Sequence, residues 1–192
     1  MPAPSHKRRA TAKRKVAGPT IWTIGHSTRP LAEFLALLAQ FRIEAVADVR
    51  RFPGSRRNPQ YAPDTLGTAL SGAGIANHWL PALGGRRRAR PDSPNTAWRN
   101  ASFRGYADHI SSAEFAGGLR ELLALCARLR TVVMCAEAVW WRCHRSLIAD
   151  VLRVRGFEVI HIMDAKHAVA HPFTAPARVV RGKLTYAPRT RA

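Results

Sequence analysis

Residues 131–152 read TVVMCAEAVWWRCHRSLIADVL and contain a complete strand–loop–helix unit. The apolar run Thr131–Cys135 predicts a buried strand, and a polar loop follows it. From about Cys143 the spacing predicts a helix that ends at Gly156. Its apolar face consists of Leu147, Ile148, Val151 and Leu152. A buried strand leading directly into an amphipathic helix is typical of an α/β protein.

The same alternation extends along the chain on both sides of this unit. Further strands are predicted at Ile21–Ile24, Ala45–Val49, Ile75–Leu80 and Phe157–Met163. The helices between them are predicted to begin with Thr28 as cap and Pro30 in the first turn, at Pro63–Asp64, and at a Ser111–Glu114 capping box. We therefore expect an α/β fold of three layers with a largely parallel sheet of about five strands. A short C-terminal hairpin, Ala177–Tyr186, should turn at Arg181–Gly182.

The charge of the chain is strongly positive. Thirty-one Lys and Arg residues against twelve Asp and Glu give a net charge of +19 over 192 residues. Residues 1–18 carry six of these cations and no acidic residue, and they predict a disordered basic tail ahead of a single α/β domain at 19–192. The domain itself stays at +13, so a polyanion, nucleic acid first, is the expected partner.

Features that the sequence lacks lead to our expectations about the cellular compartment and about a cofactor. No apolar run is long enough for a membrane span, and the charged N-terminus has no apolar stretch behind it that would make a secretory signal. Three cysteines do not form a disulfide framework. We expect a cytoplasmic protein with no membrane association and no cofactor.

Polar residues follow the predicted strands at their carboxyl ends. His26 and Ser27 follow the first strand, Asp48 and Arg50 the second, and Glu137 the fourth. Because the crevice of a parallel sheet lies at these ends, we predict one shared pocket. His26, Asp48 and Glu137 are candidates for acid/base catalysis, and Ser27 and Arg50 for substrate binding. Alternatively, His26 caps the helix or bonds a neighbouring strand, and Asp48 forms a buried salt bridge to Arg50 or Arg145.

The segment 134–146, MCAEAVWWRCHRS, concentrates reactive side chains before a helix N-terminus. Such a terminus favours anions, so Arg142, His144 and Arg145 are candidates for phosphate binding, and Cys143 for a thiol of lowered pKa. Cys135 as a nucleophile would require an arginine six residues later, but Trp141 stands there. Cys135, Cys143, His144 and His26 lack the short ligand spacing of a structural zinc site, so no metal is expected.

Arginines alternate with aromatic residues in two predicted loops. In 84–104, read as a long polar loop, and around Phe52, this pattern suits phosphate contact combined with base stacking. The candidates for nucleic-acid binding are Arg51, Arg56, Arg57, Arg86, Arg87, Arg88 and Trp98.

Four motifs together resemble one known family. TIGHST at 23–28, DVRRFPGSRRNPQ at 48–60, CAE at 135–137 and CHRSLIA at 143–149 are similar to the family known as domain of unknown function 488. The similarity extends over roughly residues 20–186. It implies a bacterial or archaeal intracellular α/β protein without an agreed activity.

Three functions remain open at this point. The first is an enzyme that acts on nucleic acid, DNA being the expected form, or on a nucleotide, by hydrolysis at a phosphate or glycosidic bond. The second is a cysteine-dependent enzyme that acts on a small oxyanion or a sulfur substrate through Cys135 or Cys143. The third is a noncatalytic nucleic-acid-binding module.

Overall fold

The computed structural model describes residues 18–54 and 56–189, so the predicted tail at 1–18 lies, except for Gly18, outside the described residues. A six-stranded sheet has the order β3-β2-β4-β1-β5-β6, and the first five strands run parallel. Its strands are β1 (Thr20–Gly25), β2 (Ala45–Asp48), β3 (Ala76–Trp79), β4 (Thr131–Cys135), β5 (Glu158–Ile162) and β6 (Ala168–Ala170). A separate hairpin joins β7 (Arg178–Val180) to β8 (Lys183–Thr185).

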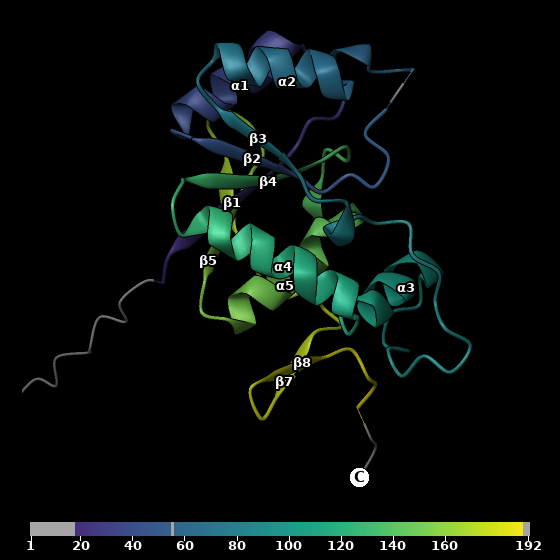
Figure 1. Ribbon diagram of the computed structural model, residues 1–192. Coiled ribbons are helices and arrows are strands. Elements are labelled where there is room, and N and C mark those ends of the chain that lie inside the picture. Colours follow the sequence, from purple (N-terminus) through teal and green to yellow (C-terminus); the bar gives the residue numbers. More distant parts are fainter. Residues whose placement is uncertain (1–17, 55, 190–192) are drawn as a thin grey trace, which may run out of the picture.

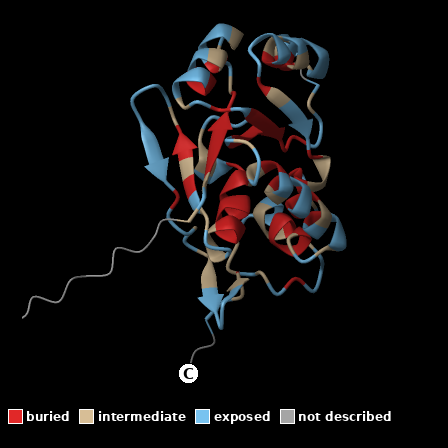
Figure 2. Ribbon diagram, turned by 60° about the vertical axis from the view of Figure 1, so that its left-hand side comes forward, coloured by how far each residue is buried: buried red, intermediate tan, exposed pale blue. Residues whose placement is uncertain are grey.

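In the described part of the chain, five α-helices complete three layers with the sheet (Figure 1). They are α1 (Leu31–Gln40), α2 (Pro63–Gly72), α3 (Ala101–His109), α4 (Ala113–Cys126) and α5 (Arg145–Val154). Alternate side chains of the central strands supply two separate cores. In β4, Val132 and Met134 pack with α1 and α2, whereas Val133 and Cys135 pack with α4 and α5. Figure 2 shows the resulting buried interior, with exposed residues on the outer helix faces.

The α/β class, the mostly parallel sheet and the C-terminal hairpin are confirmed. The five predicted strands form the parallel part of the sheet, and a short sixth strand, β6, pairs antiparallel at its edge. Its three residues are all exposed, so it carries no alternation of apolar and polar side chains by which a strand is recognised.

The predicted helix starts need three corrections. Pro30, not Thr28, occupies the N-cap position of α1. Ser112, not Ser111, caps α4 by accepting a hydrogen bond from the Phe115 amide, so the Ser111–Glu114 capping box does not form. The loop predicted at 84–104 ends at Asn100, whose side chain accepts hydrogen bonds from the first amides of α3.

The chain leaves the sheet toward opposite faces after two neighbouring strands. β1 leads into α1 on one face, and β4 leads through residues 136–144 into α5 on the other. The two loops stay joined at their bases, because the amide of His26 donates to the Cys135 carbonyl at 3.0 Å and that of Ser27 to the Ala136 carbonyl at 2.9 Å. Such a switch point is where an open α/β sheet forms a crevice.

A buried carboxylate attaches the C-terminal hairpin to the body of the protein. Asp150 of α5 is completely buried and accepts hydrogen bonds from His171, from the amide and hydroxyl of Thr174, and from the Tyr186 hydroxyl at 2.9 Å. These donors offset the cost of removing a charge from water. No helix in the described part of the chain combines the length and apolar character needed to cross a membrane.

We predict that Tyr186→Phe lowers the free energy of unfolding by about 1.5–3 kcal/mol, the usual contribution of a hydrogen bond to a charged group. Tyr61→Phe is the matched control: Tyr61 is equally buried but donates to the neutral carbonyl of Arg29, so its loss should cost only about 0.5–1.5 kcal/mol. Urea unfolding of both variants measures the difference. Equal losses would contradict the central role given to Asp150.

Candidate functional site

Two thiols and an imidazole meet at the carboxyl end of β4, and we call them the cysteine–histidine cluster: Cys135, Cys143 and His144. His144 Nδ1 lies 3.9 Å from Cys135 Sγ and 3.7 Å from Cys143 Sγ. The other ring nitrogen of His144 is 3.2 Å from the carbonyl oxygen of Val49, which follows β2. Because a carbonyl can only accept, Nε2 carries a proton in this contact, and the ring turns Nδ1 toward both sulfurs.

The neighbouring Arg145 supports this cluster from inside the protein. Its guanidinium is 1% exposed and donates from Nε to Cys143 Sγ at 3.4 Å, from Nη1 to the Thr23 hydroxyl at 3.4 Å, and from Nη2 to the Glu137 carbonyl at 2.6 Å. Gly25 makes room for it: a Cβ there would lie 2.8 Å from Nη2 and 1.8 Å from the Glu137 oxygen. Arg145 therefore holds the loop after β4 and directs its donors to protein atoms.

The environments of the two cysteines push their pKa values apart. Burial acts to raise the pKa of Cys143, but a hydrogen bond from Cys135 and the charges of His144 and Arg145 outweigh it and hold this pKa well below its usual value. The same hydrogen bond, followed by burial, raises the pKa of Cys135 well above its usual value. The cluster thus favours one thiolate, at Cys143, beside one thiol.

A chain of hydrogen bonds, here called the relay, runs from Arg145 to Asp150 through three buried side chains. Thr23 Oγ1 is 2.6 Å from His161 Nδ1, His161 Nε2 is 2.9 Å from His171 Nδ1, and His171 Nε2 is 3.0 Å from the Asp150 carboxylate. The direction is fixed at the two ends, because an arginine can only donate and a carboxylate can only accept: Arg145 donates to Thr23, and His171 Nε2 donates to Asp150.

The relay keeps its first histidine uncharged. Burial, together with the nearby His171 and Arg145, lowers the pKa of His161 to about 2. Trp140 covers this ring in a parallel stack with centroids 4.4 Å apart. The neutral ring can therefore accept from Thr23 while it donates to His171.

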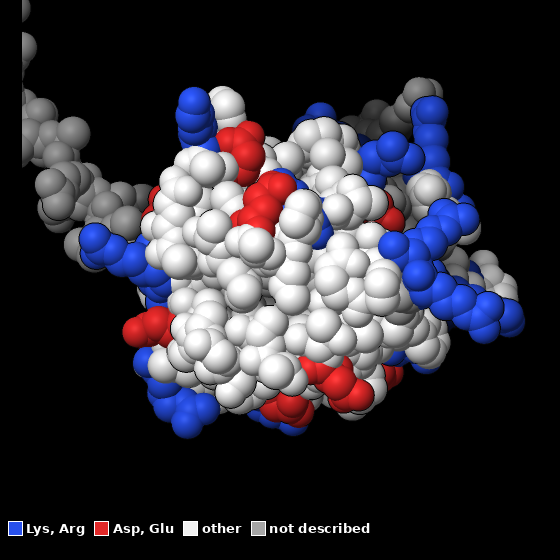
Figure 3. Space-filling model, turned by 90° about the horizontal axis from the view of Figure 1, so that it is seen from above, with Lys and Arg blue, Asp and Glu red and all other residues white. Residues whose placement is uncertain are grey.

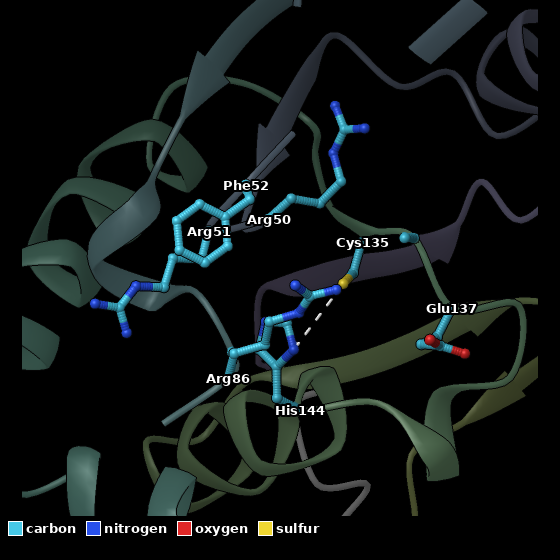
Figure 4. Close-up of a pocket in the computed structure, with 9 residues that line it drawn as sticks. Arg50, Arg51, Phe52, Arg86, Cys135, Glu137 and His144 are labelled. Carbon is cyan, nitrogen blue, oxygen red and sulfur yellow. Dashed lines mark hydrogen bonds between the residues drawn. The ribbon is translucent and has the colours of Figure 1, made fainter. Parts of the chain in front are cut away.

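Two adjoining cavities open onto the cysteine–histidine cluster. One, of about 170 Å³, is lined by Cys135 and His144, and the other, of about 240 Å³, by Cys143 and His144. Arg86 and Glu137 border both cavities. Figure 4 shows Arg86 extending over the first cavity in the direction of His144, whereas Arg50 points away from the cluster. The cluster is thus buried but reachable from the surface.

Beyond these cavities the surface continues as a basic groove, defined by Arg51, Arg86, Arg88 and Arg90. Its cavity of about 410 Å³ shares Arg51 and Arg86 with the cavity above Cys135. Phe52 stands at this junction with 64% of its surface exposed, and the guanidinium carbons of Arg51 and Arg86 lie 5.7 and 6.0 Å from its ring centre. Figure 3 shows cationic side chains gathered at the right-hand edge, the side on which α3 lies in Figure 1.

The loop that carries the groove is held against α3. Asp108 accepts hydrogen bonds from the Ser93 hydroxyl, the Asn95 side chain and the Arg90 amide. Gly105 allows the loop to approach, because a Cβ at this position would lie 2.4 Å from the Arg87 carbonyl oxygen. The arginines therefore project from an ordered loop.

Three predicted residues form a second buried group beside the cavities. The Asp48 carboxylate pairs with Arg50 at 2.6 Å, and Arg50 Nη1 is 3.3 Å from His26 Nε2. His26 stacks on Tyr61 with ring centres 4.0 Å apart, and burial is the main cause that lowers the pKa of His26 to about 4. Asp48 is thus in the salt bridge considered as the alternative to catalysis. Among these three residues, it is Arg50 that lines one of the cavities described above, the cavity at Cys135.

The remaining candidates divide between the cavities and other parts of the surface. The cavity beside Cys143 is lined by Glu137, Arg142, Cys143 and His144, and the cavity of the basic groove is lined by Arg51, Arg86 and Arg88 and also by Arg87. Arg87 is paired with Glu114 at 2.8 Å. Arg56 and Arg57 are exposed but outside the described cavities, Ser27 is half-buried, and Trp98 stacks on Phe103 at 4.7 Å, packed against the core.

Sequence reasoning missed several residues that surround the cluster. Tyr106 and Phe103 line the cavity beside Cys143, although 101–104 was expected to be loop. His161 and His171 were not assigned any role. The available signal was His161, a polar residue within the apolar stretch 159–162 of β5, which indicates a buried partner without identifying it.

Comparison with known proteins identifies one family and no relative of known activity. No curated protein and no solved structure matches the chain. The model of the family described as domain of unknown function DUF488 matches residues 30–152, more than half of the chain, and this segment contains both cysteines of the cluster and His144. The chain therefore belongs to the DUF488 family.

Proposed function

We propose that the protein is an enzyme that acts on nucleic acid or a nucleotide, with DNA as the expected nucleic acid. The basic groove binds phosphates, and the bond to be broken lies at the cysteine–histidine cluster. One observation carries this proposal: Arg86 borders all three cavities, so the groove adjoins the two cavities that open onto Cys135, Cys143 and His144.

The composition of the groove supports this class of substrate. Arginine side chains make charge-assisted and bidentate hydrogen bonds to phosphate oxygens. An exposed aromatic ring between two such cations suits a nucleobase, because every base has a π face that can stack. Phe52, between Arg51 and Arg86, has this arrangement.

The proposed reaction is hydrolysis at a phosphate or glycosidic bond. Glu137 borders both cavities of the cluster and is the carboxylate proposed to exchange protons with the substrate. His26 and Asp48 then act indirectly, since they hold Arg50 at the wall of the cavity above Cys135.

A specific observation favours a second candidate, cysteine-dependent chemistry on a small oxyanion or a sulfur substrate. Cys143 Sγ receives a hydrogen bond from Arg145 and lies 3.7 Å from a ring nitrogen of His144. Such surroundings suit a nucleophilic sulfur. This candidate predicts that metal-free protein remains active and that iodoacetamide abolishes turnover by labelling Cys143. Cys126→Ser should not change this result, because Cys126 lies on α4, outside the cluster. Full turnover after complete labelling would exclude it.

We predict that nucleic-acid binding weakens steeply with salt and that two groove arginines account for part of this dependence. Replacing both Arg51 and Arg86 by Gln should reduce the slope of log affinity against log salt by about 2, because each phosphate contact contributes about 0.9. Fluorescence anisotropy with labelled single- and double-stranded DNA and RNA measures the slopes.

The matched control for this experiment removes the same charge elsewhere. Arg120→Gln combined with Arg155→Gln replaces two exposed arginines outside the groove and should leave the slope nearly unchanged. An equal loss in both double variants would assign binding to overall charge and contradict the groove. A flat salt titration of the unaltered protein would contradict the proposed substrate class.

We also predict that Phe52→Ala weakens binding of single-stranded oligonucleotides by about 1–3 kcal/mol, the contribution of one base stacked on an aromatic ring. Phe52→Trp should retain affinity. Phe173→Ala, which removes another exposed phenylalanine flanked by an arginine, is the control and should bind normally. Because Phe52 is largely exposed, thermal unfolding of its variants should stay unchanged.

A further inference from the structure

We propose that the cysteine–histidine cluster is a zinc site with three protein ligands, Cys135, Cys143 and His144, and a fourth position open to the cavities. Two thiolates and an imidazole are donors that zinc prefers. Their ligating atoms all lie within 4.8 Å of one another, and no other group of three such side chains in the described ranges, 18–54 and 56–189, is so arranged.

The separations fit a tetrahedral ion. Zinc binds sulfur at about 2.3 Å and nitrogen at about 2.0–2.1 Å, so sulfur–nitrogen edges of a tetrahedron measure about 3.6 Å and the sulfur–sulfur edge about 3.8 Å. His144 Nδ1 is 3.7 Å from one sulfur and 3.9 Å from the other. An ion could therefore enter with only small movements of the side chains.

The groups behind the ligands also suit a metal. A metal-binding histidine usually donates its other ring N–H to a carbonyl or carboxylate, which fixes the tautomer. His144 does this through Nε2 to the Val49 carbonyl. Arg145 Nε donates to Cys143 Sγ, as outer-shell donors do to metal-bound thiolates.

The ligands come from both sides of the loop after β4. Cys135 ends β4, while Cys143 and His144 directly precede α5. The spacing of seven intervening residues does not resemble that of structural zinc motifs, and this led to the expectation of no metal. Arg145 brings the ends together, because it bonds Cys143 on one side and the Glu137 carbonyl on the other.

An open fourth position would make the site catalytic rather than structural. Cys135 and His144 line one cavity, and Cys143 and His144 line the other, so water or substrate can approach between them. A zinc-bound water is acidic enough to act as a nucleophile near neutral pH. In the proposed hydrolysis the water oxygen would bond to the phosphorus or the glycosidic carbon while the bond from that atom to the leaving group breaks, and the proton that the water loses would end on the leaving group. This role rests on the proposed function, whereas the metal site itself does not.

Cobalt binding tests the site without a substrate. The full chain, stripped of metal by a chelator under reducing conditions, should bind one equivalent of Co²⁺, with the visible bands of a tetrahedral ion and a sulfur-to-cobalt charge-transfer band. Cys135→Ser and Cys143→Ser should each roughly halve the charge-transfer band. They should weaken zinc binding by more than about 100-fold, beyond the 10–100-fold typical of outer-shell changes. His144→Ala should weaken zinc binding as much as the cysteine variants do, but it should keep the charge-transfer band because both sulfurs remain.

Two controls keep the test decisive. Cys126→Ser and His78→Ala change a cysteine and a histidine outside the cluster and should retain normal zinc affinity. If a cluster variant fails to fold, the unaltered chain still answers: zinc should protect Cys135 and Cys143, but not Cys126, from alkylation, as identified by mass spectrometry.

The proposal is overturned if the reduced protein retains neither zinc nor cobalt, or if the cobalt spectrum does not respond to either cysteine. It is equally overturned if Cys135 and Cys143 are joined in a disulfide that persists under reducing conditions. Failure here is distinguishable from failure of the proposed function, because the salt-dependent binding of oligonucleotides is measured on metal-free protein. Loss of that binding with an intact cobalt site would overturn only the proposed function.

Discussion

Arg145 and Asp150 are a buried cation and a buried anion on one helix, and they are linked through Thr23, His161 and His171 rather than in direct contact. Buried charges are costly unless hydrogen bonds satisfy them. Here polar side chains of the relay satisfy both charges, Thr23 at the guanidinium and His171 at the carboxylate. The relay of hydrogen bonds can form only when strands β1 and β5, helix α5 and the segment after β6 are all in place.

The geometry of the cluster depends on the same buried arginine. Arg145 reaches the sulfur before α5 and the carbonyl after β4, and its third contact, Thr23, lies on β1. The imidazole of His144 is oriented independently, from Val49 at the end of β2. Three neighbouring strands thus each contribute one constraint to the position of the cysteines. The exposed arginines and Phe52 at the mouth of the cavities lie outside this set of constraints.

The sequence was sufficient for those features that depend on local pattern. Thr131–Cys135 was recognisable as a strand because five consecutive residues avoid charge, and Gly182 marked the hairpin turn. The sequence was insufficient to predict the surroundings of a side chain whose partners are distant along the chain. An arginine at a helix start is ordinarily exposed, whereas Arg145 is buried and one of its partners, Thr23, lies 122 positions away. By contrast, the partner of Asp48 is only two positions away, and its salt bridge with Arg50 was one of the two interpretations that the sequence allowed.

The relay also has a consequence for where the folding unit ends. The family is recognised by residues 30–152, which include both charged ends of the chain of bonds, Arg145 and Asp150. Every link between them, Thr23, His161 and His171, lies outside that segment. A fragment cut at the limits of the family match would take Thr23 from Arg145 and would remove His171, Thr174 and Tyr186, which all donate to the Asp150 carboxylate. The segment by which the family is recognised is therefore smaller than the unit that these hydrogen bonds hold together.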